Sequence, residues 1–233
     1  MLHIENLRID LGGQTILENI NLDLAAGHSL ALSGASGSGK TTLLRAIAGL
    51  AEPQEGRIVC QAKRLAYLYQ EPRLLPWLRA DENIRLVAPD ASDARIRQLL
   101  AELWLDGKDA RKYPHELSGG MQQRIALARA LITEPDLLLM DEPFSALDLR
   151  LRDELQQRII RTIEGGTSVV LVTHDAQEAV RLAQHIYCLG GKPATTFAEI
   201  RLPDPFHHRD HAWCVAKSAH PALRGIEEAA LSD

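Results

Sequence analysis

The sequence has few long hydrophobic runs and no recognisable leader. Among its 233 residues, the longest apolar stretches are residues 65–69 and 212–216, whereas a helix that spans a bilayer needs about 20 apolar residues. Residues 1–6 lack the basic segment followed by an apolar one that a secretory signal peptide requires. We therefore expect a protein that does not cross a membrane itself and stays in the compartment where it is made.

Cysteine and clustered positive charge are also scarce. Cys60, Cys188 and Cys214 form no Cys-x-x-Cys pair, so the sequence offers neither a disulfide framework nor the ligand spacing of a zinc site. We predict three buried thiols. The net charge is -5 and no long basic block occurs, so the charge pattern gives no support for nucleic acid as the main ligand.

The remaining composition is that of a globular protein with alternating strands and helices. Hydrophobic residues make up 45% and charged residues 24%, which excludes a fibrous or disordered chain. We predict strands at residues 2–10, 20–24 and 29–33, and helices at 40–50, at two places between 81 and 104, and at 121–131. Continuous apolar runs at 137–140 and 169–172 are typical of strands buried on both faces of a parallel sheet. One α/β domain over residues 1–233 is expected.

A glycine-rich loop follows the third predicted strand and precedes a predicted helix. Residues 34–41 read G-x-x-x-x-G-K-[ST], a pattern whose backbone N–H groups surround phosphate oxygens at the positive end of a helix. We expect Lys40 to reach the β- and γ-phosphates and the Thr41 hydroxyl to bind Mg²⁺. The predicted phosphate-binding residues are Gly34, Ala35, Ser36, Gly37, Ser38, Gly39, Lys40, Thr41 and Thr42. The motif also occurs in kinases and GTPases, so it indicates a ligand and not a reaction.

Two adjacent carboxylates end the apolar run at 137–140. Successive strand residues point in opposite directions, so Asp141 and Glu142 can act differently. Asp141 is predicted to hold the Mg²⁺ shell and Glu142 to polarise the attacking water. The alternative is a solvated strand end with two ordinary acids.

A second candidate anion site lies between these two motifs. Ser118, Gly119 and Gly120 stand directly ahead of a predicted helix, although such a tripeptide alone is usually only a helix cap. With the phosphate loop and the acidic pair, in this order, it resembles the L-S-G-G-Q signature of the ATP-binding cassette ATPases, here with Met121 in the last place. The resemblance extends from about residue 2 to residue 189. It implies a P-loop NTPase core with a mainly parallel sheet, an N-terminal antiparallel β subdomain, a helical subdomain at about 71–133 and a C-terminal tail at about 190–233.

The resemblance also implies roles for residues that are unremarkable alone. Gln70 corresponds to the glutamine that senses Mg²⁺ and water, and Asp148 ends the D-loop at 145–148, which lies along the dimer interface in the family. His174 corresponds to the histidine that contacts the γ-phosphate, and ligands of open α/β sheets do bind beyond the carboxyl ends of strands. The predicted catalytic residues are Glu142, His174 and Gln70; the metal ligands are Thr41, Gln70 and Asp141; further nucleotide contacts are Ser118, Gly119, Gly120 and Asp148.

One residue departs from the family pattern. Leu11 stands just before a predicted turn at Gly12 and Gly13, where the family usually has an aromatic residue that stacks on adenine. An aliphatic side chain covers a base without a π face, and base stacking on an aromatic ring contributes about 1 to 3 kcal/mol. We therefore predict weaker ATP affinity or less strict base choice.

Family members work as head-to-tail pairs, so the resemblance implies a homodimer with ATP and Mg²⁺ as cofactors. In it, residues 118–120 of one copy would close over the ATP held by Lys40 of the other. Transport would require integral membrane permease subunits, a solute-binding protein and a peripheral location on the cytoplasmic face of the cell membrane. Residues 70–77 and 113–116 resemble the nitrate, sulfonate and taurine branch of bacterial importers. Arg73 and Trp77 are candidate interface anchors, unless they cover a small core under a loop.

Two other functions stay open. A soluble cassette ATPase acting on DNA or the ribosome is one, although Leu117 follows Lys40 too closely for a long coiled-coil insertion. A nucleotide sensor without turnover is the other, although Lys40, Asp141, Glu142 and His174 are all present.

The tail carries three neighbouring histidines. His207, His208 and His211 offer a metal site if the segment is helical. Pro203 and Pro205 favour an extended, solvated segment instead.

Overall fold

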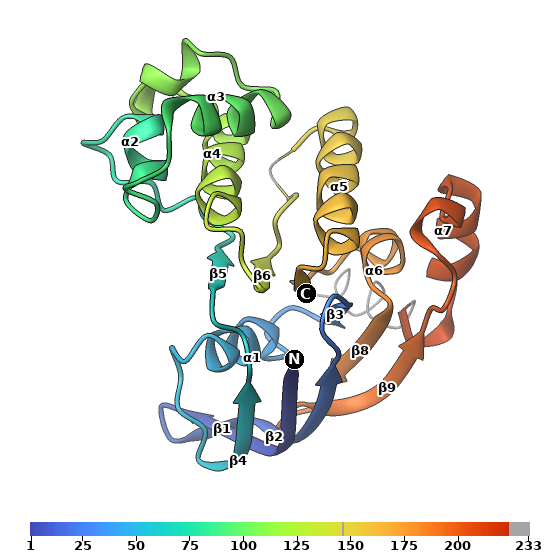
Figure 1. Cartoon of the computed structure of the whole chain (residues 1–233). Coiled ribbons are helices and arrows are strands. Elements are labelled where there is room, and N and C mark those ends of the chain that lie inside the picture. Colours follow the sequence, from blue (N-terminus) through green and yellow to red (C-terminus); the bar gives the residue numbers. More distant parts are fainter. Residues whose placement is uncertain (146, 224–233) are drawn as a thin grey trace.

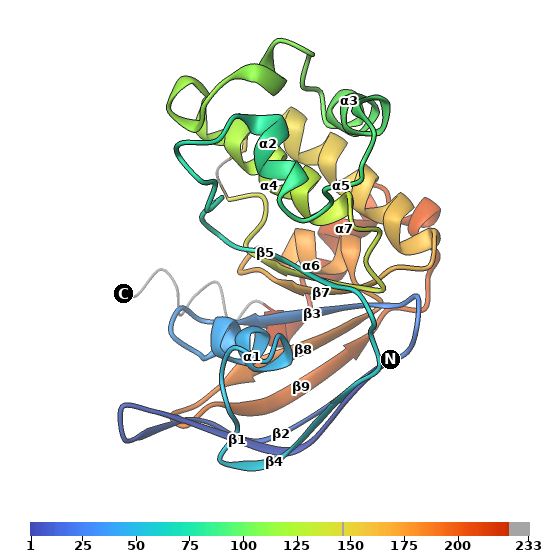
Figure 2. The same ribbon diagram turned by 60° about the vertical axis from the view of Figure 1, so that its left-hand side comes forward.

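The computed structural model describes residues 1–145 and 147–223. Within these residues a parallel sheet separates a group of helices from a smaller antiparallel sheet (Figures 1 and 2). The predicted α/β class is confirmed. No helix in this part of the chain combines the length and the hydrophobicity that crossing a bilayer demands.

The larger sheet has the order β5-β6-β7-β3-β8-β9. It contains β3 (Ser29–Gly34), β5 (Leu65–Leu68), β6 (Leu137–Asp141), β7 (Ser168–Val172), β8 (His185–Gly190) and β9 (Thr195–Arg201), of which only β9 runs antiparallel to its neighbour. All residues of β3, β6 and β7 are buried, as the continuous apolar runs at 137–140 and 169–172 predict for β6 and β7. The carboxyl ends of these three strands therefore meet at one edge of the sheet.

The two faces of this sheet pack against different partners, because side chains alternate along each strand. Leu138, Met140 and Val169 face α4 (Gly119–Leu131) and α5 (Leu149–Glu164). Leu139 and Val170 join α1 (Lys40–Ile47) and the antiparallel sheet in a second core. Figure 2 shows α1 between the two sheets.

The antiparallel sheet has the order β2-β1-β4, formed by β1 (Leu2–Leu11), β2 (Gln14–Leu24) and β4 (Glu55–Cys60). The turn between β1 and β2 lies at Gly12 and Gly13, with φ of 59° and 80°, the left-handed geometry that two-residue hairpins need. The second strand begins at Gln14 and not near Ile20, because it pairs with β1 from directly after the turn, with Gln14 opposite Leu11. A backbone hydrogen bond from Ala194 to the Ile16 carbonyl holds this part of the strand on its other side.

Between β5 and β6 the chain leaves the sheet and forms α2 (Ala80–Arg85), α3 (Asp93–Glu102), two short 3-10 turns at Asp109–Arg111 and Pro114–Glu116, and α4. The predicted apolar face of α3 is buried, and it includes Ile96, Leu99 and Leu100. These helices lie on the side of the larger sheet opposite to β1, β2 and β4 (Figure 2).

The part of the C-terminal segment that the structure describes, up to residue 223, is attached to the rest of the fold through Arg209. Arg209 is 4% exposed and donates hydrogen bonds to the carbonyls of Val180, Ala183, Leu202 and Asp204 at 2.6–3.0 Å. The segment is therefore anchored and turned and not extended, although His207, His208 and His211 are exposed as expected. These contacts tie the chain between β9 and α7 (His211–Ser218) to α6 (Ala176–Leu182).

The histidine and cysteine predictions also need correction. His207 and His208 belong to the 3-10 turn Phe206–His208, whereas His211 begins α7, so the three do not share a helical face. The described residues contain no group of three His, Cys, Asp or Glu that could hold a metal ion. Cys188 and Cys214 are buried as predicted, and burial raises the pKa of Cys188 to about 11. Cys60 is only partly buried because it ends β4, a strand at the edge of its sheet.

Candidate functional site

The glycine-rich loop connects β3 to α1 in a conformation that requires glycine. Gly39 precedes the first residue of α1 with φ 81°, and a Cβ atom there would come within 2.6 Å of the Leu17 side chain. Gly37 has φ 75°. Glycine at these positions lets the backbone turn sharply and lets N–H groups face inward. The N-terminus of α1 therefore opens onto the carboxyl edge of the larger sheet.

Lys40 lies over this loop and is only 6% exposed. Its Nζ donates hydrogen bonds to the carbonyls of Gly34 and Ala35, both at 2.7 Å. Burial lowers the pKa of Lys40, while Glu142 and Asp141 oppose that shift. The ammonium group is thus held at the loop by neutral carbonyl oxygens. Negatively charged phosphate oxygens at this position would stabilise its positive charge more strongly.

Two predicted metal ligands meet beside Lys40. The Thr41 hydroxyl donates to Asp141 Oδ1 at 3.0 Å, and the Tyr67 hydroxyl lies 3.5 Å from Asp141 Oδ2. Asp141 is 5% exposed, and its burial, with Glu142 nearby, raises the pKa of its carboxyl group. Mg²⁺ prefers oxygen ligands, carboxylates among them, and a bound cation would stabilise the charged form of the buried Asp141 carboxylate. Thr41, Asp141 and the Gln70 side chain therefore fit this ion.

Glu142 joins the other two residues predicted to be catalytic. Its Oε2 accepts a hydrogen bond from Gln70 Nε2 at 3.2 Å, and its Oε1 lies 3.3 Å from His174 Nδ1. The Glu142 backbone has φ 44°, which is uncommon for a residue with a side chain and costs about 1–3 kcal/mol. The hydrogen bond from its N–H to the Val172 carbonyl, 2.9 Å long, fixes this turn to β7.

Lys40, Thr41 and the Gln70, Glu142 and His174 side chains line one cavity of about 700 Å³, a size suited to a nucleotide. The wall consists of Leu11, Ile16, residues 36–42, Gln70, Glu142 and His174. Leu11 is 48% exposed, and together with Ile16 it gives the cavity an aliphatic rim. The sequence did not indicate Ile16, because the strand was expected to begin after it.

A second cavity, of about 680 Å³, lies at the opposite ends of β6 and β7 and includes Arg95, Arg158, Glu134 and Asp136. Here Arg95 pairs with Glu134 and Arg158 with Glu102, at 3.2 and 3.1 Å. This cavity lies at the C-terminal end of α5, which carries a negative partial charge, whereas the cavity beside Lys40 lies at the positive N-terminus of α1. The cavity beside Lys40 is therefore the candidate nucleotide site.

Six predicted nucleotide contacts do not line the cavity beside Lys40. Two of them, Gly34 and Ala35, accept hydrogen bonds from Lys40 through their carbonyl groups. Ser118 is the N-cap of α4, where its Oγ accepts the Met121 N–H at 3.3 Å, and Gly119 and Gly120 begin that helix. Asp148 is the N-cap of α5, where its Oδ1 accepts the Leu151 N–H at 3.0 Å. Ala146 of the predicted D-loop lies outside the described residues. Within one copy, both helix caps are exposed and apart from Lys40.

Comparison with known proteins decides what kind of nucleotide protein this is. The model of the ABC transporter family matches residues 17–145. The aliphatic sulfonates import ATP-binding protein SsuB 2 of Nocardia farcinica is 43% identical, with 99% of this chain and 97% of the relative covered. The chain belongs to the ABC transporter family. SsuB 1 of Xanthomonas axonopodis pv. citri, also named for aliphatic sulfonate import, is 41% identical over 97% of this chain and 95% of its own length.

Solved structures agree with the ABC assignment. A dimeric ATP-binding cassette in a post-hydrolysis state, bound to ADP and Pi, is 30% identical and superimposes with a TM-score of 0.79, covering 88% of this chain and 100% of that one. The ATP-binding cassette is therefore both the fold and the family of this protein, as its motifs predict.

Sequence reasoning missed one group of residues beside the site. Thr173, Glu178 and Arg152 line a small cavity that also includes Glu142 and His174. A signal was present in α6, because Glu178 lies among the buried residues Ala176, Ala179 and Val180. An acid on an otherwise apolar helix face is a candidate for a specific role.

Proposed function

We propose that this chain is the ATP-hydrolysing subunit of an ABC import system whose cargo is an aliphatic sulfonate. The observation that carries the proposal is the Glu142 carboxylate, which contacts both Gln70 and His174 at the mouth of the phosphate loop. The cargo is inferred from relatives that are named for aliphatic sulfonate import and align along nearly the whole chain.

Each residue of the cavity has a role in this proposal. Residues 34–42 bind the phosphates of ATP, with Lys40 on the β- and γ-phosphates. Mg²⁺, held by Thr41, Asp141 and Gln70, neutralises negative charge on the phosphate oxygens when it is bound. Glu142 accepts the proton of the attacking water, and His174 donates a hydrogen bond to the γ-phosphate. Leu11 and Ile16 cover the base.

The site is completed by a second copy of the chain. Ser118, Gly119 and Gly120 are exposed or partly exposed at the positive end of α4, away from their own Lys40, and such a helix end attracts phosphate. In a head-to-tail homodimer they contact the ATP of the partner, with Asp148 at the interface. In this arrangement one cassette spans residues 1–233, with residues of about 71–133 as its helical subdomain.

The exposed loop that carries Trp77, between β5 and α2, is the proposed contact with the permease. Trp77 is 68% exposed, and its loop is fixed by buried Asn83, whose side chain bonds the backbone of Leu75, Leu78 and Arg79 at 2.8–3.2 Å. A rigid exposed tryptophan is typical of an interface anchor. Integral membrane subunits bound here would hold the protein at the cytoplasmic face of the membrane. The import system would also include a solute-binding protein.

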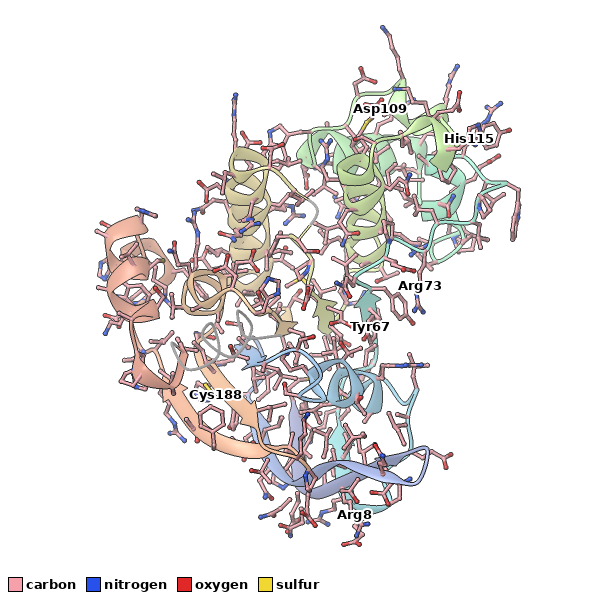
Figure 3. All side chains as sticks on the ribbon, turned by 180° about the vertical axis from the view of Figure 1, so that it is seen from behind. Arg8, Tyr67, Arg73, Asp109, His115 and Cys188 are labelled. Carbon is pink, nitrogen blue, oxygen red and sulfur yellow. The ribbon has the colours of Figure 1, made fainter. Side chains whose placement is uncertain are left out.

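Arg73 packs on the aromatic residues at the end of β5. Its guanidinium group lies 4.1 Å from the centre of the Tyr69 ring, which in turn stacks on Tyr67 at 4.1 Å. Figure 3 shows Arg73 and Tyr67 near each other where β5 leads toward α2. Arg73 therefore packs on the end of β5, and Trp77 remains the better candidate for contact with a permease.

The test is phosphate release from Mg-ATP, with Glu142→Gln as the matched variant. We expect turnover by the wild type, and binding without turnover by the variant, which should accumulate as an ATP-bound dimer in size-exclusion chromatography with light scattering. Wild-type turnover by the variant would exclude Glu142 from catalysis. For the cargo, the complex purified with its permease and solute-binding protein should show ATPase stimulation by alkane sulfonates and none by nitrate; the reverse would reject the sulfonate assignment.

A further inference from the structure

A buried carboxylate lies beneath the turn that carries His174. Glu178, in the first turn of α6, is 5% exposed, and its Oε2 accepts the Thr173 hydroxyl at 2.7 Å. Thr173 is 2% exposed, and its Oγ1 accepts the Asp175 N–H at 3.0 Å. The residues before and after His174 are therefore both connected to Glu178 through one hydroxyl group.

Arg152 connects this turn to another element. Its Nη1 lies 3.0 Å from Asp175 Oδ2 and 3.5 Å from Glu178 Oε1. Arg152 is in the first turn of α5, and its N–H bonds the Asp148 carbonyl at 2.9 Å. The turn after β7 is thus joined, through one guanidinium group, to the start of α5 and to the segment that the proposed function places at the dimer interface.

These groups share a cavity with the proposed catalytic residues. It measures about 140 Å³ and is lined by Glu142, Ser145, Arg152, Thr173, His174, Asp175 and Glu178. Glu142 and His174 also line the nucleotide cavity. A shift of the Glu178–Arg152 pair would therefore change the surroundings of the residue proposed to activate the water and of the residue proposed to contact the γ-phosphate.

We propose that Glu178 is a positioning residue for His174, and that its contact with Arg152 sets the hydrolysis rate according to whether the Glu178 carboxyl group is ionised. This inference rests on the ATPase function proposed above. Glu178 touches no substrate in it. It acts through Thr173 on the turn at residues 173–175, and Arg152 couples the position of that turn to the first residues of α5.

Glu178 changes its charge near neutral pH, where the ATPase activity can be measured on both sides of the transition. Burial raises its pKa to about 7, and Asp175 acts in the same direction, while the Thr173 hydrogen bond, Arg152 on α5 and His174 lower it. Above that pH the carboxylate holds Arg152 by charge, and below it the contact is between a cation and a neutral acid. We expect kcat to rise as the pH increases through about 7.

The experiment compares the full chain with Glu178→Gln, which keeps the size and a hydrogen-bond acceptor for Thr173 but carries no charge. Near pH 8, where ionised Glu178 positions His174 in the wild type, we expect kcat of the variant to be about five- to tenfold lower. Near pH 6 we expect kcat within about twofold of wild type. KM for ATP should be unchanged within about twofold at both pH values. Arg152→Met should give the same loss near pH 8, and the double variant no further loss. The exposed residues Glu164 and Arg161 of α5 provide matched controls as Glu164→Gln and Arg161→Met.

Thermal unfolding separates positioning from a purely structural role. Because Glu178→Gln removes a buried charge, it should raise Tm near pH 8 while it lowers kcat. A parallel fall of Tm and kcat, an equal loss of kcat at both pH values, or unchanged kcat near pH 8 would overturn the inference. Wild-type protein that releases no phosphate would reject the proposed function and this inference together, whereas normal wild-type turnover with an unaffected Glu178→Gln variant would reject this inference alone.

Discussion

The Thr41 hydroxyl donates a 3.0 Å hydrogen bond to a carboxylate oxygen of Asp141, although the two residues are 100 positions apart in the chain. Thr41 is the second residue of α1, which follows β3, and Asp141 ends β6, which is separated from β3 by β7 in the sheet. The contact is possible because all three parallel strands end at the same edge. It places a hard oxygen donor pair next to Lys40.

Replacing Asp141 by asparagine should stabilise the ligand-free protein while it slows hydrolysis. The folded state raises the pKa of Asp141, so this group contributes stability that is present in acid and is lost as the pH rises through the folded pKa. Asp141→Asn should therefore raise Tm at neutral pH and have less effect in acid. Mg²⁺-dependent phosphate release should fall at least about tenfold. Both quantities are measurable by scanning calorimetry and a phosphate assay.

Asp136 provides the control for that prediction, because it precedes the same strand β6. Backbone N–H groups of Arg64 and Lys63 lower its pKa, so its contribution to stability is present at neutral pH and is lost as the pH falls through the folded pKa. Asp136→Asn should therefore lower Tm at neutral pH and leave phosphate release unchanged. Shifts of Tm with the same sign for the two variants would contradict this account.

Leu11→Tyr should strengthen nucleotide binding. Leu11 is half-exposed at the rim of the nucleotide cavity, so a tyrosine ring there has room to stack on adenine and contribute about 1 to 3 kcal/mol. We expect the dissociation constant of ATP, measured by titration calorimetry, to fall by about fivefold or more. Val59→Tyr, at a similarly exposed position on β4, should leave it unchanged. An unchanged constant for Leu11→Tyr would reject the stacking argument.

Arg209→Met should destabilise the fold strongly. The Arg209 guanidinium bonds four backbone carbonyls, and burial lowers its pKa to about 10. Methionine fills similar space but leaves those acceptors without a partner, so we expect a loss of roughly 3 kcal/mol or more in the free energy of unfolding by urea. The exposed Arg201, as Arg201→Met, should leave this free energy nearly unchanged. Equal effects of the two variants would show that the buried hydrogen bonds contribute little.

Trp77→Ala should separate assembly from catalysis. The variant removes the exposed indole and leaves the Asn83 hydrogen bonds to its loop intact, so phosphate release and Tm should stay at wild-type values. Binding to the permease should weaken by about 2 kcal/mol or more, seen as loss of co-purification from detergent extracts. Trp104→Ala, at another exposed tryptophan, is the control. Retention of the permease by the Trp77 variant would place the interface elsewhere.

Much of this site could be predicted because its parts are local. Residues 34–41 and the acidic pair after residues 137–140 each combine one apolar strand with the turn that follows it, and the physical requirements of phosphate binding fix their spacing. The order of the motifs then identified the family. The partial exposure of Cys60 and the anchored C-terminal segment were missed, since each depends on a partner distant in sequence. The first residues of β2 were missed although they pair with β1 across a two-residue turn.

The sequence by itself determined the phosphate loop, the carboxylates, the α/β class and the ABC family, because these follow from short patterns and from their order. Only the tertiary structure decided which groups meet. It brought Thr41 to Asp141, Gln70 and His174 to Glu142, and Arg152 to Glu178, and it left Ser118 and Asp148 outside the cavity of their own chain. The physical reason is that sheet order and helix packing, and not distance along the chain, set the separation of side chains.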